Sequence, residues 1–423
     1  NHIWSVLVCT MIDLLGVIQI GTGLLATVPL IDHWWRMRRV SRRQKMEPQE
    51  KTTDSPIVVV LPIWNEEKII QIRLENLAHQ QYAGNWSLMI VDSASTDASL
   101  QIIDTWLSEN PEEFANIPSI VRMPQRLGKT AAVNVALDNI DLESIVVLTD
   151  ADVLFPPDSL GRISHWFGSD PTIGAVSGAP RPLSNRFTSA ERNEETYRRF
   201  YIDQRVGESL LDSTPISEGS LLAFRRDAIG DSRLDMTTNA DDSQLSVMIR
   251  RTGLRSIFDS KLVFQEHIPT DSVENNQRSI RRARGLQNLF WMNRDLWLSQ
   301  KEGPFNRIFR RQAWIHLIAP VLVTISFMSM FAHIALTMVR IQSGESVLIG
   351  DLALAFMSSL GIVVYLLGDW IPLGRTLKSY LRGQSILMRV YLDRIIRRNA
   401  AIWKPTQTNR DALLKWSQRK KEF

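Results

Sequence analysis

Apolar and polar residues are unevenly distributed along this chain, and three long apolar stretches lie near its two ends. They cover residues 3–31, roughly 314–339 and roughly 347–371. A helix of about 20 residues crosses the hydrocarbon core of a bilayer, so each stretch is long enough for a membrane span. The first stretch is too long for a cleaved signal peptide, and no basic region precedes it. We therefore predict a transmembrane helix at residues 1–35 and a transmembrane hairpin at residues 314–372.

Basic residues flank all three apolar stretches. Arginine and lysine are frequent directly after the first stretch (residues 36–45), before the hairpin (residues 307–311) and after it (residues 375–421). Because basic residues beside a membrane span are retained on the cytosolic side, the N-terminus is expected outside and the three basic flanks inside. The pattern predicts a multi-pass membrane protein with a basic cytosolic linker at residues 36–55 and a cytosolic catalytic region.

The segment after the hairpin, residues 373–423, contains one further pattern. Between residues 380 and 396, apolar side chains alternate with arginines. This favours an amphipathic helix that lies on the membrane surface, followed by a basic cytosolic tail. A helix packed against the catalytic domain explains the same pattern equally well.

Short β-branched runs alternate with helical patterns in the middle of the chain, residues 56–270. Strands are predicted at residues 57–61, 87–91 and 145–148, and a helix near residues 66–79 follows the first of them. This alternation is typical of an α/β domain with a Rossmann-like, mostly parallel sheet that is covered by helices on both faces. In such sheets ligands bind at the carboxyl ends of the strands, so the residues after each strand are candidates for a functional site.

Carboxylate side chains follow each of these three strands. Glu66 comes after the first strand, Asp92 and Asp97 after the second, and Asp150 and Asp152 after the third. A single acidic residue in a loop is usually a helix cap, which is the role that we favour for Asp97. Three such loops at one edge of a sheet are not explained by capping alone. Asp150 and Asp152 can converge on a hard divalent cation such as Mg²⁺ or Mn²⁺, which would neutralise a diphosphate leaving group.

Composition narrows the class of protein further. The 423-residue chain is too long for one typical domain, and much of its net charge of +4 lies beside the apolar stretches. No basic stripe interleaved with aromatic residues occurs in the middle segment, so nucleic-acid binding is not expected. Cys9 is the only cysteine, which excludes an intrachain disulfide and agrees with a reducing compartment.

Several short motifs occur in an order and spacing that are specific in combination. They are LPIWNE (residues 61–66), VDSASTD (91–97), RLGK (126–129) with Asn134, DAD (150–152), SEGS (217–220) with AFRR (223–226), and ADD (240–242). Over about residues 56–284 the sequence therefore resembles the family-two glycosyltransferases, which have the GT-A fold. With its flanking apolar stretches it is similar to the integral-membrane branch, which includes cellulose, hyaluronan and poly-N-acetylglucosamine synthases and the ceramide glucosyltransferases.

This resemblance implies roles for individual residues. Asp242 matches the general base of an inverting transferase, which deprotonates the acceptor hydroxyl as the diphosphate leaves. Asp152 matches the metal ligand, and His267 is a weaker candidate for a further ligand because a lone histidine is more often structural. The residues at donor-binding positions are Pro62, Asn65, Glu66, Asp92, Lys129, Asp150 and Arg281.

Further candidates for the acceptor side or for support of the site are Asp241, Glu218, Gly219, Arg278 and Arg282. Asp241 and Gln244 have the spacing of a capping box, and apolar residues follow at helical intervals. We therefore expect Asp241 to cap a helix. Adjacent side chains on a helix diverge by ~100°, which leaves Asp242 to face the cleft.

The interface segment at residues 271–313 departs from the pattern of the processive synthases. Those enzymes carry Q-x-x-R-W, whereas here the best register places Arg278, Arg281 and Arg282 at the Gln, Arg and Trp positions. The tryptophan that would stack on an acceptor sugar is absent. Three spans can hardly enclose a polysaccharide channel unless the protein forms a homo-oligomer. The arginines would also attract anionic membrane lipids.

The sequence thus predicts an inverting, metal-dependent glycosyltransferase. The resemblance implies a nucleotide-diphosphate-sugar donor, with UDP favoured, a Mg²⁺ or Mn²⁺ cofactor, and a membrane-associated acceptor that is either a lipid or a glycan chain end. The first alternative is a processive polysaccharide synthase that also translocates its product. The non-enzymatic alternative is an inactive membrane scaffold, which need not keep Asp242 together with Asp150 and Asp152.

Overall fold

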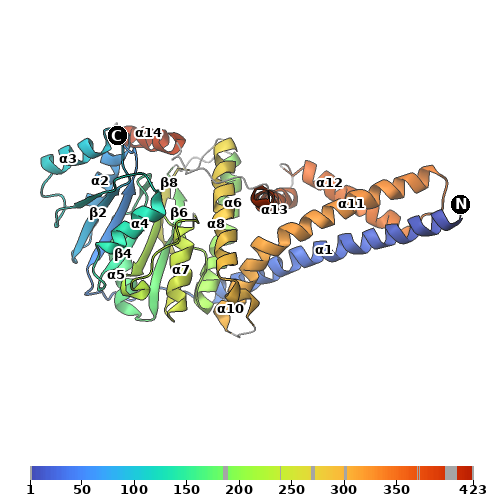
Figure 1. Ribbon diagram of the computed structural model, residues 1–423, viewed down its shortest axis with the longest axis horizontal. Helices are drawn as coiled ribbons and strands as arrows, with labels where there is room; N and C mark the ends of the chain where they lie inside the picture. Colours follow the sequence, from blue (N-terminus) through green and yellow to red (C-terminus); the bar gives the residue numbers. More distant parts are fainter. Residues whose placement is uncertain are drawn as a thin grey trace. The chain divides into compact units, whose positions relative to one another are not determined.

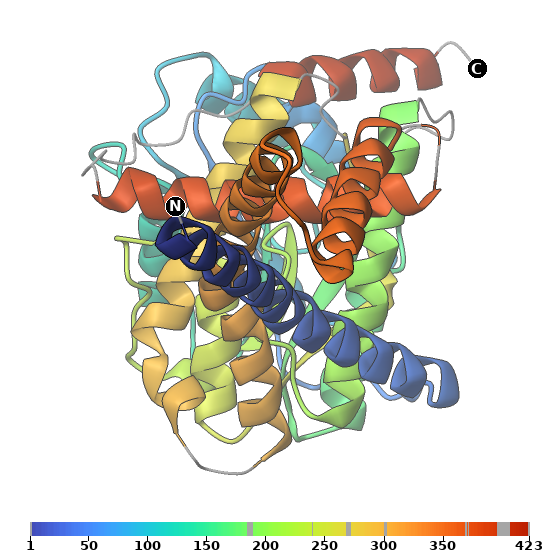
Figure 2. The same ribbon diagram turned by 90° about the vertical axis from the view of Figure 1, so that its right-hand side faces the viewer.

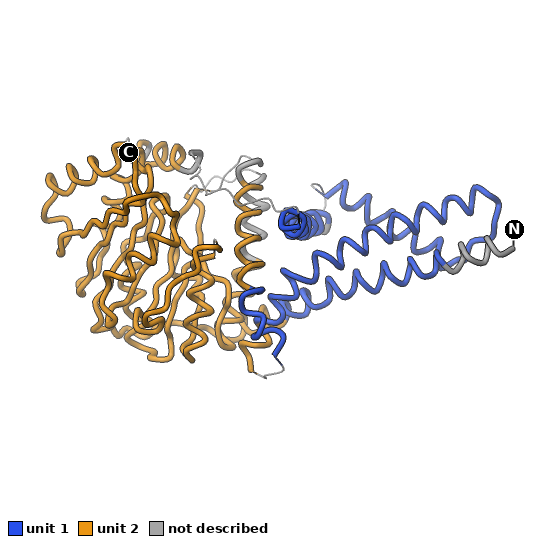
Figure 3. The backbone as a smooth tube through the Cα atoms, in the orientation of Figure 1, with its two compact units in different colours: residues 1–35, 290–300, 309–399 blue, residues 36–289, 301–308, 400–423 orange. Residues whose placement is uncertain are grey.

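The computed structural model describes residues 2–183, 189–238, 240–267, 272–299, 303–368, 370, 372–395 and 407–421. The chain forms two compact units (Figure 3). We call the first the helical unit; it comprises Asn1–Trp35, Phe290–Gln300 and Phe309–Asn399. We call the second the sheet unit; it comprises Arg36–Leu289, Lys301–Ile308 and Ala400–Phe423. Residues 400–423 thus belong to the sheet unit, whereas the sequence analysis had placed them in one segment with residues 373–399.

The sheet unit is built on one eight-stranded sheet with the strand order β3-β2-β1-β4-β7-β6-β8-β5 (Figure 1). Strand β1 pairs in parallel with β2 and β4, β2 pairs in parallel with β3, and β6 with β8. Strand β7 is antiparallel to β4 and β6, and β5 is antiparallel to β8. This mixed but mostly parallel sheet confirms the predicted α/β fold class. The strands are β1 Ile57–Ile63, β2 Trp86–Asp92, β3 Ser119–Arg122, β4 Ile145–Thr149, β5 Val153–Leu154, β6 Ile173–Pro182, β7 Leu221–Arg225 and β8 Arg255–Glu266.

Apolar side chains are buried on both faces of the central strands. In β1, Ile57, Val59 and Leu61 join one hydrophobic cluster, while Val60 joins a second cluster on the other face. Helices α2, α3 and α5 cover the first face, and α4 and α7 cover the second. Their bounds are α2 Ile70–Ala78, α3 Ser99–Glu109, α4 Lys129–Asp138, α5 Ser159–Ser169 and α7 Asp241–Arg251. Burial on both faces explains why the strand sequences are continuous β-branched runs rather than alternating ones.

The sheet unit contains further helices besides the five that cover the two faces of the sheet. Helix α6 precedes β7, and the short helix η1 follows it. Helix α8 follows β8, and its last residues belong to the helical unit. Helix α14 joins the first hydrophobic cluster through Leu413, which is fully buried. The bounds are α6 Ser189–Leu211, η1 Asp227–Ile229, α8 Ser272–Met292, α10 Pro304–Ala313 and α14 Gln407–Lys421.

The predicted capping box at the start of α7 is wrong. Helix α7 begins at Asp241 itself, the cap position is Ala240, and no side chain caps it. Gln244 instead bonds to the loop before the helix, because its Oε1 accepts from the Asp235 N–H (2.9 Å) and its Nε2 donates to the Asp235 carbonyl (3.2 Å). Because the Gln244 side chain bonds to Asp235, it is not available for the capping box. Helix α2 also starts later than predicted, at Ile70, because the residues after β1 form a loop.

The helical unit contains α1 as far as Trp35, α11, α12 and α13, together with α9 and the π-helical turn η2. Helices α11 and α12 run side by side as a hairpin, and α13 contacts both (Figure 2). Polar contacts join α1 to α12 and α11 to α12. Gln19 Nε2 donates to Ser358 Oγ (2.8 Å), and His333 Nε2 lies 3.3 Å from Asp351 Oδ1. Helix α13 includes most of the predicted amphipathic stretch. The bounds are α1 His2–Arg43, α9 Arg294–Leu298, η2 Trp314–Ile318, α11 Ala319–Gln342, α12 Ile349–Leu366 and α13 Pro372–Ile395.

Three helical segments of the described chain are long and apolar enough to cross a membrane. They are Met11–Arg43, Pro304–Gln342 and Ile349–Leu366, with mean hydropathies of 1.9, 2.0 and 1.9 over their most apolar windows. The three apolar helices predicted from the sequence are therefore present. Their orientation in a membrane remains a prediction.

Candidate active site

The carboxyl ends of β1, β2 and β4 lie next to one another because the three strands are parallel neighbours. The loops after β1 and β2 are joined by hydrogen bonds: Ser95 Oγ accepts from the Asn65 N–H (2.9 Å), and Asn65 Oδ1 accepts from the Thr96 N–H (2.8 Å). Asn65 has a φ of 53°, a left-handed conformation that asparagine adopts more readily than most residues. Asn65 thus fastens the two loops to each other at the position where we expected a donor-binding residue.

Asp97 and Asp92 hold the loop after β2. Asp97 Oδ1 accepts from the Ser99 N–H (3.0 Å) in the first turn of α3, and its Oδ2 accepts from the Glu67 N–H (3.1 Å) in the loop after β1. The cap position of α3 is Ala98 and no side chain caps it, so the predicted capping role of Asp97 is wrong; its carboxylate instead joins the start of α3 to the loop after β1. Asp92 is almost fully buried, and both of its carboxylate oxygens accept from the Ser95 N–H (3.1 and 3.2 Å). Pro62 is the register partner of Val91 at the end of β1.

Lys129 lies at the centre of the site. It is the first residue of α4, and its Nζ is 2.6 Å from Asp150 Oδ1 and 3.7 Å from Asp241 Oδ2. The same Nζ donates to the Gly219 carbonyl oxygen (3.1 Å). Burial would lower the pKa of Lys129, but the carboxylates of Asp150 and Asp241 outweigh it and raise the pKa. Lys129 is therefore charged, and it joins the turn after β4, the loop before β7 and the start of α7.

Asp150 is fixed on both of its oxygens. Lys129 engages Oδ1, and Ser220 Oγ donates to Oδ2 (2.8 Å). Burial would raise the pKa of Asp150, but Lys129 and the Ser220 hydroxyl lower it below the ordinary value. The carboxylate is therefore ionised at neutral pH and held in one orientation.

The turn that carries both aspartates is braced at both ends from α2. Arg73 is fully buried, and its Nη2 donates to Thr149 Oγ1 (2.6 Å) before the turn. Its Nη1 donates to Asn76 Oδ1 (2.5 Å), and Asn76 in turn accepts from the Phe155 N–H and donates to the Phe155 carbonyl (both 2.9 Å) after the turn. Burial lowers the pKa of Arg73 to about 9, against the charges of the two aspartates. Sequence reasoning missed Arg73, because a helical arginine usually faces solvent.

Asp150 is held by Lys129 and Ser220. The assignment of Asp152 as the metal ligand stays a prediction from the resemblance. Among the residues that the structure describes, no group of three or more His, Cys, Asp or Glu side chains could hold a metal ion by itself. A metal at Asp152 would therefore need further ligands such as the phosphate oxygens of a bound nucleotide. His267 directly follows β8, and its weak assignment as a further ligand stays a prediction.

Asp242 lies in the first turn of α7, and its Oδ1 accepts from the Ser243 N–H (2.6 Å). Burial, followed by the negative charges of Asp241 and Glu218, raises the pKa of Asp242 to about 7 against the opposing effects of Ser243 and Lys129. A carboxyl group that titrates near neutral pH is suited to accept a proton from a hydroxyl group.

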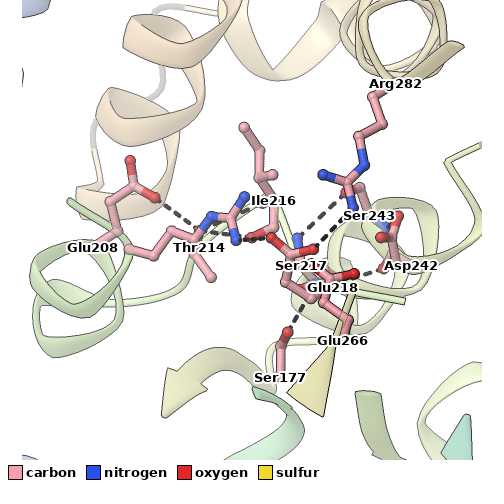
Figure 4. Close-up of polar contacts among 12 residues, drawn as sticks. Ser177, Glu208, Thr214, Ile216, Ser217, Glu218, Asp242, Ser243, Glu266 and Arg282 are labelled. Carbon is pink, nitrogen blue, oxygen red and sulfur yellow. Dashed lines mark hydrogen bonds and ion pairs between the residues drawn. The ribbon is translucent and has the colours of Figure 1, made fainter. Parts of the chain in front are cut away.

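Glu218 lies next to Asp242 in the loop before β7 (Figure 4). Its Oε1 is 2.5 Å from Arg205 Nη1 on α6, and its Oε2 is 3.6 Å from Arg282 Nη2 on α8. Burial would raise the pKa of Glu218, but the two arginines lower it. The backbone N–H of Glu218 donates to Ser177 Oγ (2.8 Å) on β6. The loop is thus anchored on three sides, and Arg205 is a second residue that sequence reasoning did not identify.

The arginines of α8 have different surroundings. Arg278 donates to Glu266 (2.8 Å), the last residue of β8, and that carboxylate raises the pKa of Arg278. Burial, together with Arg282 and Arg278, lowers the pKa of Arg281 to about 10, while Asp241 and Asp150 oppose the shift. The charges of Asp241 and Asp150 thus act on Arg281. Its contact with the donor diphosphate stays a prediction.

Glu66 has a partner from a distant part of the chain. Both oxygens of the Glu66 carboxylate accept from Arg410 on α14, at 2.6 and 2.8 Å. Burial nevertheless raises the pKa of Glu66 to about 7, because it outweighs the effect of Arg410. No signal in the sequence pointed to Arg410, which occurs in a segment that reads as a basic tail.

Comparison with known proteins agrees with this geometry. Residues 58–232 match the family described as Glycosyl transferase family 2. This match supports the predicted family for that segment, and the predicted GT-A fold class is confirmed.

Curated relatives carry names of the same class. An N-acetylglucosaminyltransferase of Rhizobium leguminosarum bv. viciae is 21% identical over 275 residues, which are 62% of this chain and 63% of the relative. An undecaprenyl-phosphate 4-deoxy-4-formamido-L-arabinose transferase of Photorhabdus laumondii subsp. laumondii is 29% identical over 109 residues, which are 25% of this chain and 32% of the relative. The chain thus spans less than two thirds of the length of these curated relatives.

One solved structure is similar over most of the chain. It is the mannosyltransferase PcManGT from Pyrobaculum calidifontis in complex with GDP-Man and Mn²⁺, at 27% identity and a TM-score of 0.72. The match covers 91% of this chain and 100% of the other. The similarity therefore extends beyond residues 58–232.

Proposed function

We propose that this chain is an inverting glycosyltransferase that moves a sugar from a nucleotide-diphosphate donor to a hydroxyl group of a membrane-associated acceptor. The observation that carries the proposal is the position of Asp242. It lies beside the Lys129–Asp150 pair at the carboxyl ends of the strands, and its pKa is about 7. A base of this kind can be ionised at neutral pH and still accept a proton from an attacking hydroxyl group.

In this reaction the acceptor oxygen forms a bond to the anomeric carbon of the donor. The bond between that carbon and the diphosphate oxygen breaks, and the diphosphate leaves with the electron pair. The hydroxyl proton passes to Asp242. Lys129 and Arg281 are the cations that we assign to the negative charge of the diphosphate, which they stabilise more strongly as the bond breaks.

We assign the nucleoside to the loops after β1 and β2. Pro62, Asn65, Glu66 and Asp92 line these loops, which hydrogen bonds fasten to each other. A divalent cation bound at Asp152 would neutralise the diphosphate as it leaves. The complex of PcManGT with GDP-Man and Mn²⁺ supports a metal and a nucleotide sugar, whereas our sequence prediction favoured UDP, so both nucleotides belong in the test.

The acceptor is assigned to a membrane because of the three long apolar helices. We keep the orientation predicted from the basic flanks, with the catalytic domain cytosolic and the N-terminus outside. A lipid phosphate needs no general base, because its oxygen is already ionised. The raised pKa of Asp242 therefore supports a hydroxyl acceptor on a lipid or a glycan. Arg282, at the position of the missing tryptophan, is directed to Glu218, which supports single transfer rather than processive synthesis.

The test uses purified protein in lipid, with radiolabelled UDP- and GDP-sugars and Mg²⁺ or Mn²⁺. Products are sorted into lipid extract, high polymer and free sugar. We expect label in the lipid extract or in short glycans, together with stoichiometric nucleotide release. Label in high polymer would instead support the processive alternative. No nucleotide release with any donor would support the inactive scaffold and contradict the proposal.

A further inference from the structure

Helix α14 brings a buried cation to the carboxyl end of β1. Arg410 Nε lies 2.8 Å from Glu66 Oε2, and its Nη2 lies 2.6 Å from Glu66 Oε1 and 3.3 Å from the Trp64 carbonyl oxygen. Arg410 is 4% exposed and Glu66 is 8% exposed. The two residues therefore form a bidentate ion pair that is almost completely removed from water.

The Arg410–Glu66 ion pair is one of several contacts that hold α14 against the sheet unit. Leu413 is fully buried in the same hydrophobic cluster as the apolar residues of β1 and α2, and Trp416 packs against that cluster. At the surface, Asp411 accepts from Lys68 (3.0 Å), and both side chains are about half exposed. Lys68, in the loop that precedes α2, makes this contact, so α14 lies near the start of α2 (Figure 1). The basic tail predicted from the sequence is therefore a docked helix over its described residues.

The buried pair is not explained by stability alone. An ion pair removed from water contributes little net stability, because the cost of desolvation offsets most of the attraction. An apolar pair would seat the helix equally well. Glu66, however, lies at the edge of the sheet where the donor is assigned, close enough to Asp150 and Asp152 for their charges to act on it. Removal of Arg410 would leave a buried carboxylate without its partner, and the side chain would become protonated or move.

We propose that α14 is a component of the donor-binding site, in which Arg410 is a positioning residue that holds the Glu66 carboxylate in one orientation towards the nucleotide. The inference rests on the proposed function, because it takes the nucleotide of the donor to lie against the loop after β1. Arg410 also fixes the backbone of that loop through the Trp64 carbonyl. The ring of Trp64 packs against the guanidinium of Arg126, 3.3 Å from the ring centroid, and this stacked pair leads into the RLGK loop before Lys129.

The test compares three single variants in the full-length protein. Arg410→Gln removes the charge and keeps a polar side chain, whereas Arg410→Lys keeps the charge and loses the bidentate geometry. Asp411→Asn is the matched control, since it removes the exposed ion pair of the same helix without touching Glu66. Affinity for UDP and GDP with Mn²⁺ is measured by calorimetry, and donor KM and kcat are measured by nucleotide release.

We expect Arg410→Gln to weaken binding of the preferred nucleotide by about 10-fold or more and to raise the donor KM similarly, while kcat at saturating donor changes less than about twofold. Arg410→Lys should recover part of the affinity, and Asp411→Asn should bind like the wild type. Unchanged binding in Arg410→Gln would overturn the inference. Tighter binding would also overturn it, because α14 would then obstruct the nucleotide site. An equal loss in Asp411→Asn would also overturn it, because docking alone would explain the effect. If the wild type binds neither nucleotide, the proposed function itself fails.

Discussion

A β-carbon added at Gly219 would lie 3.3 Å from Asp242 Oδ2. The same atom would lie 3.3 Å from Lys129 Nζ, so an alanine at this position would make tight contacts with both side chains. The SEGS motif therefore has a steric reason for its glycine, although the resemblance alone implied only a general position near the acceptor.

This relationship gives the first prediction. Gly219→Ala should push Asp242 or Lys129 by a few tenths of an ångström and lower kcat by about 10-fold, because proton transfer depends on precise distance. The midpoint of thermal unfolding should change little, because the side chains of this loop can adjust. Gly230→Ala is the control that tests whether the loss of kcat is specific to Gly219. No atom lies within 4 Å of a β-carbon at Gly230, although the positive φ of this residue disfavours alanine. Full activity of Gly219→Ala would show that the close approach has no catalytic role.

The second prediction concerns pH. Because Asp242 must be ionised to accept a proton and its pKa is about 7, kcat should rise with pH up to about 7 and fall roughly 10-fold per pH unit well below it. Asp241→Asn removes a neighbouring negative charge that raises this pKa. The acidic limb of the profile should therefore move to lower pH in Asp241→Asn, while maximal activity is largely kept. A shift to higher pH, or no shift, would contradict the assigned coupling between the two aspartates.

The third prediction concerns the metal. EDTA should abolish transfer, and Mg²⁺ or Mn²⁺ should restore it, if Asp152 holds a cation together with the donor phosphates, as we propose. Asp152→Ala should lose the metal dependence of nucleotide binding, measured by calorimetry with and without Mn²⁺. Asp158→Ala, an acidic residue outside the turn at the cap position of α5, serves as the control. Activity that persists in chelator would refute the metal site.

The fourth prediction separates Arg281 from the catalytic base. Arg281→Ala should weaken nucleotide binding and slow transfer together, each by about 10- to 100-fold, as expected for loss of a charge-assisted hydrogen bond of about 1.5–3 kcal/mol. Arg294→Ala removes an exposed arginine of α9 and should leave both quantities unchanged. If Arg281→Ala reduces only kcat and leaves nucleotide affinity intact, the assigned contact with the diphosphate is wrong.

Much of the fold could be predicted because its signals are local. The buried strands β1, β2 and β4 are mainly apolar runs, and the acidic residues that follow them mark the edge where the loops meet. The three apolar helices were visible from length and hydropathy alone. Helix α2 was predicted in the right place, but it starts later than expected. The residues predicted as its first turn belong to the loop after β1.

The partners of the site residues could not be predicted, because they come from distant parts of the chain. Gln244 fits a capping box by spacing, yet Asp235 satisfies it instead. Arg410 is 344 residues from Glu66, and nothing in its surroundings distinguishes it from a solvated basic tail. Arg73 reads as an ordinary surface arginine of a helix until the DAD turn packs over it. In each case a tertiary contact decided the role of a side chain whose sequence context favoured another.

The assignment of Asp242 as the base is tested most directly by one variant. Asp242→Asn is nearly isosteric and removes only the group that accepts the proton. General-base catalysis is typically worth ~10²–10⁴-fold, so transfer should fall by about that factor while nucleotide affinity stays within about twofold of the wild type. Turnover is measured by product release and affinity by calorimetry on the same preparation. Near-normal turnover in Asp242→Asn would contradict the account, because the acceptor would then need no base at this position.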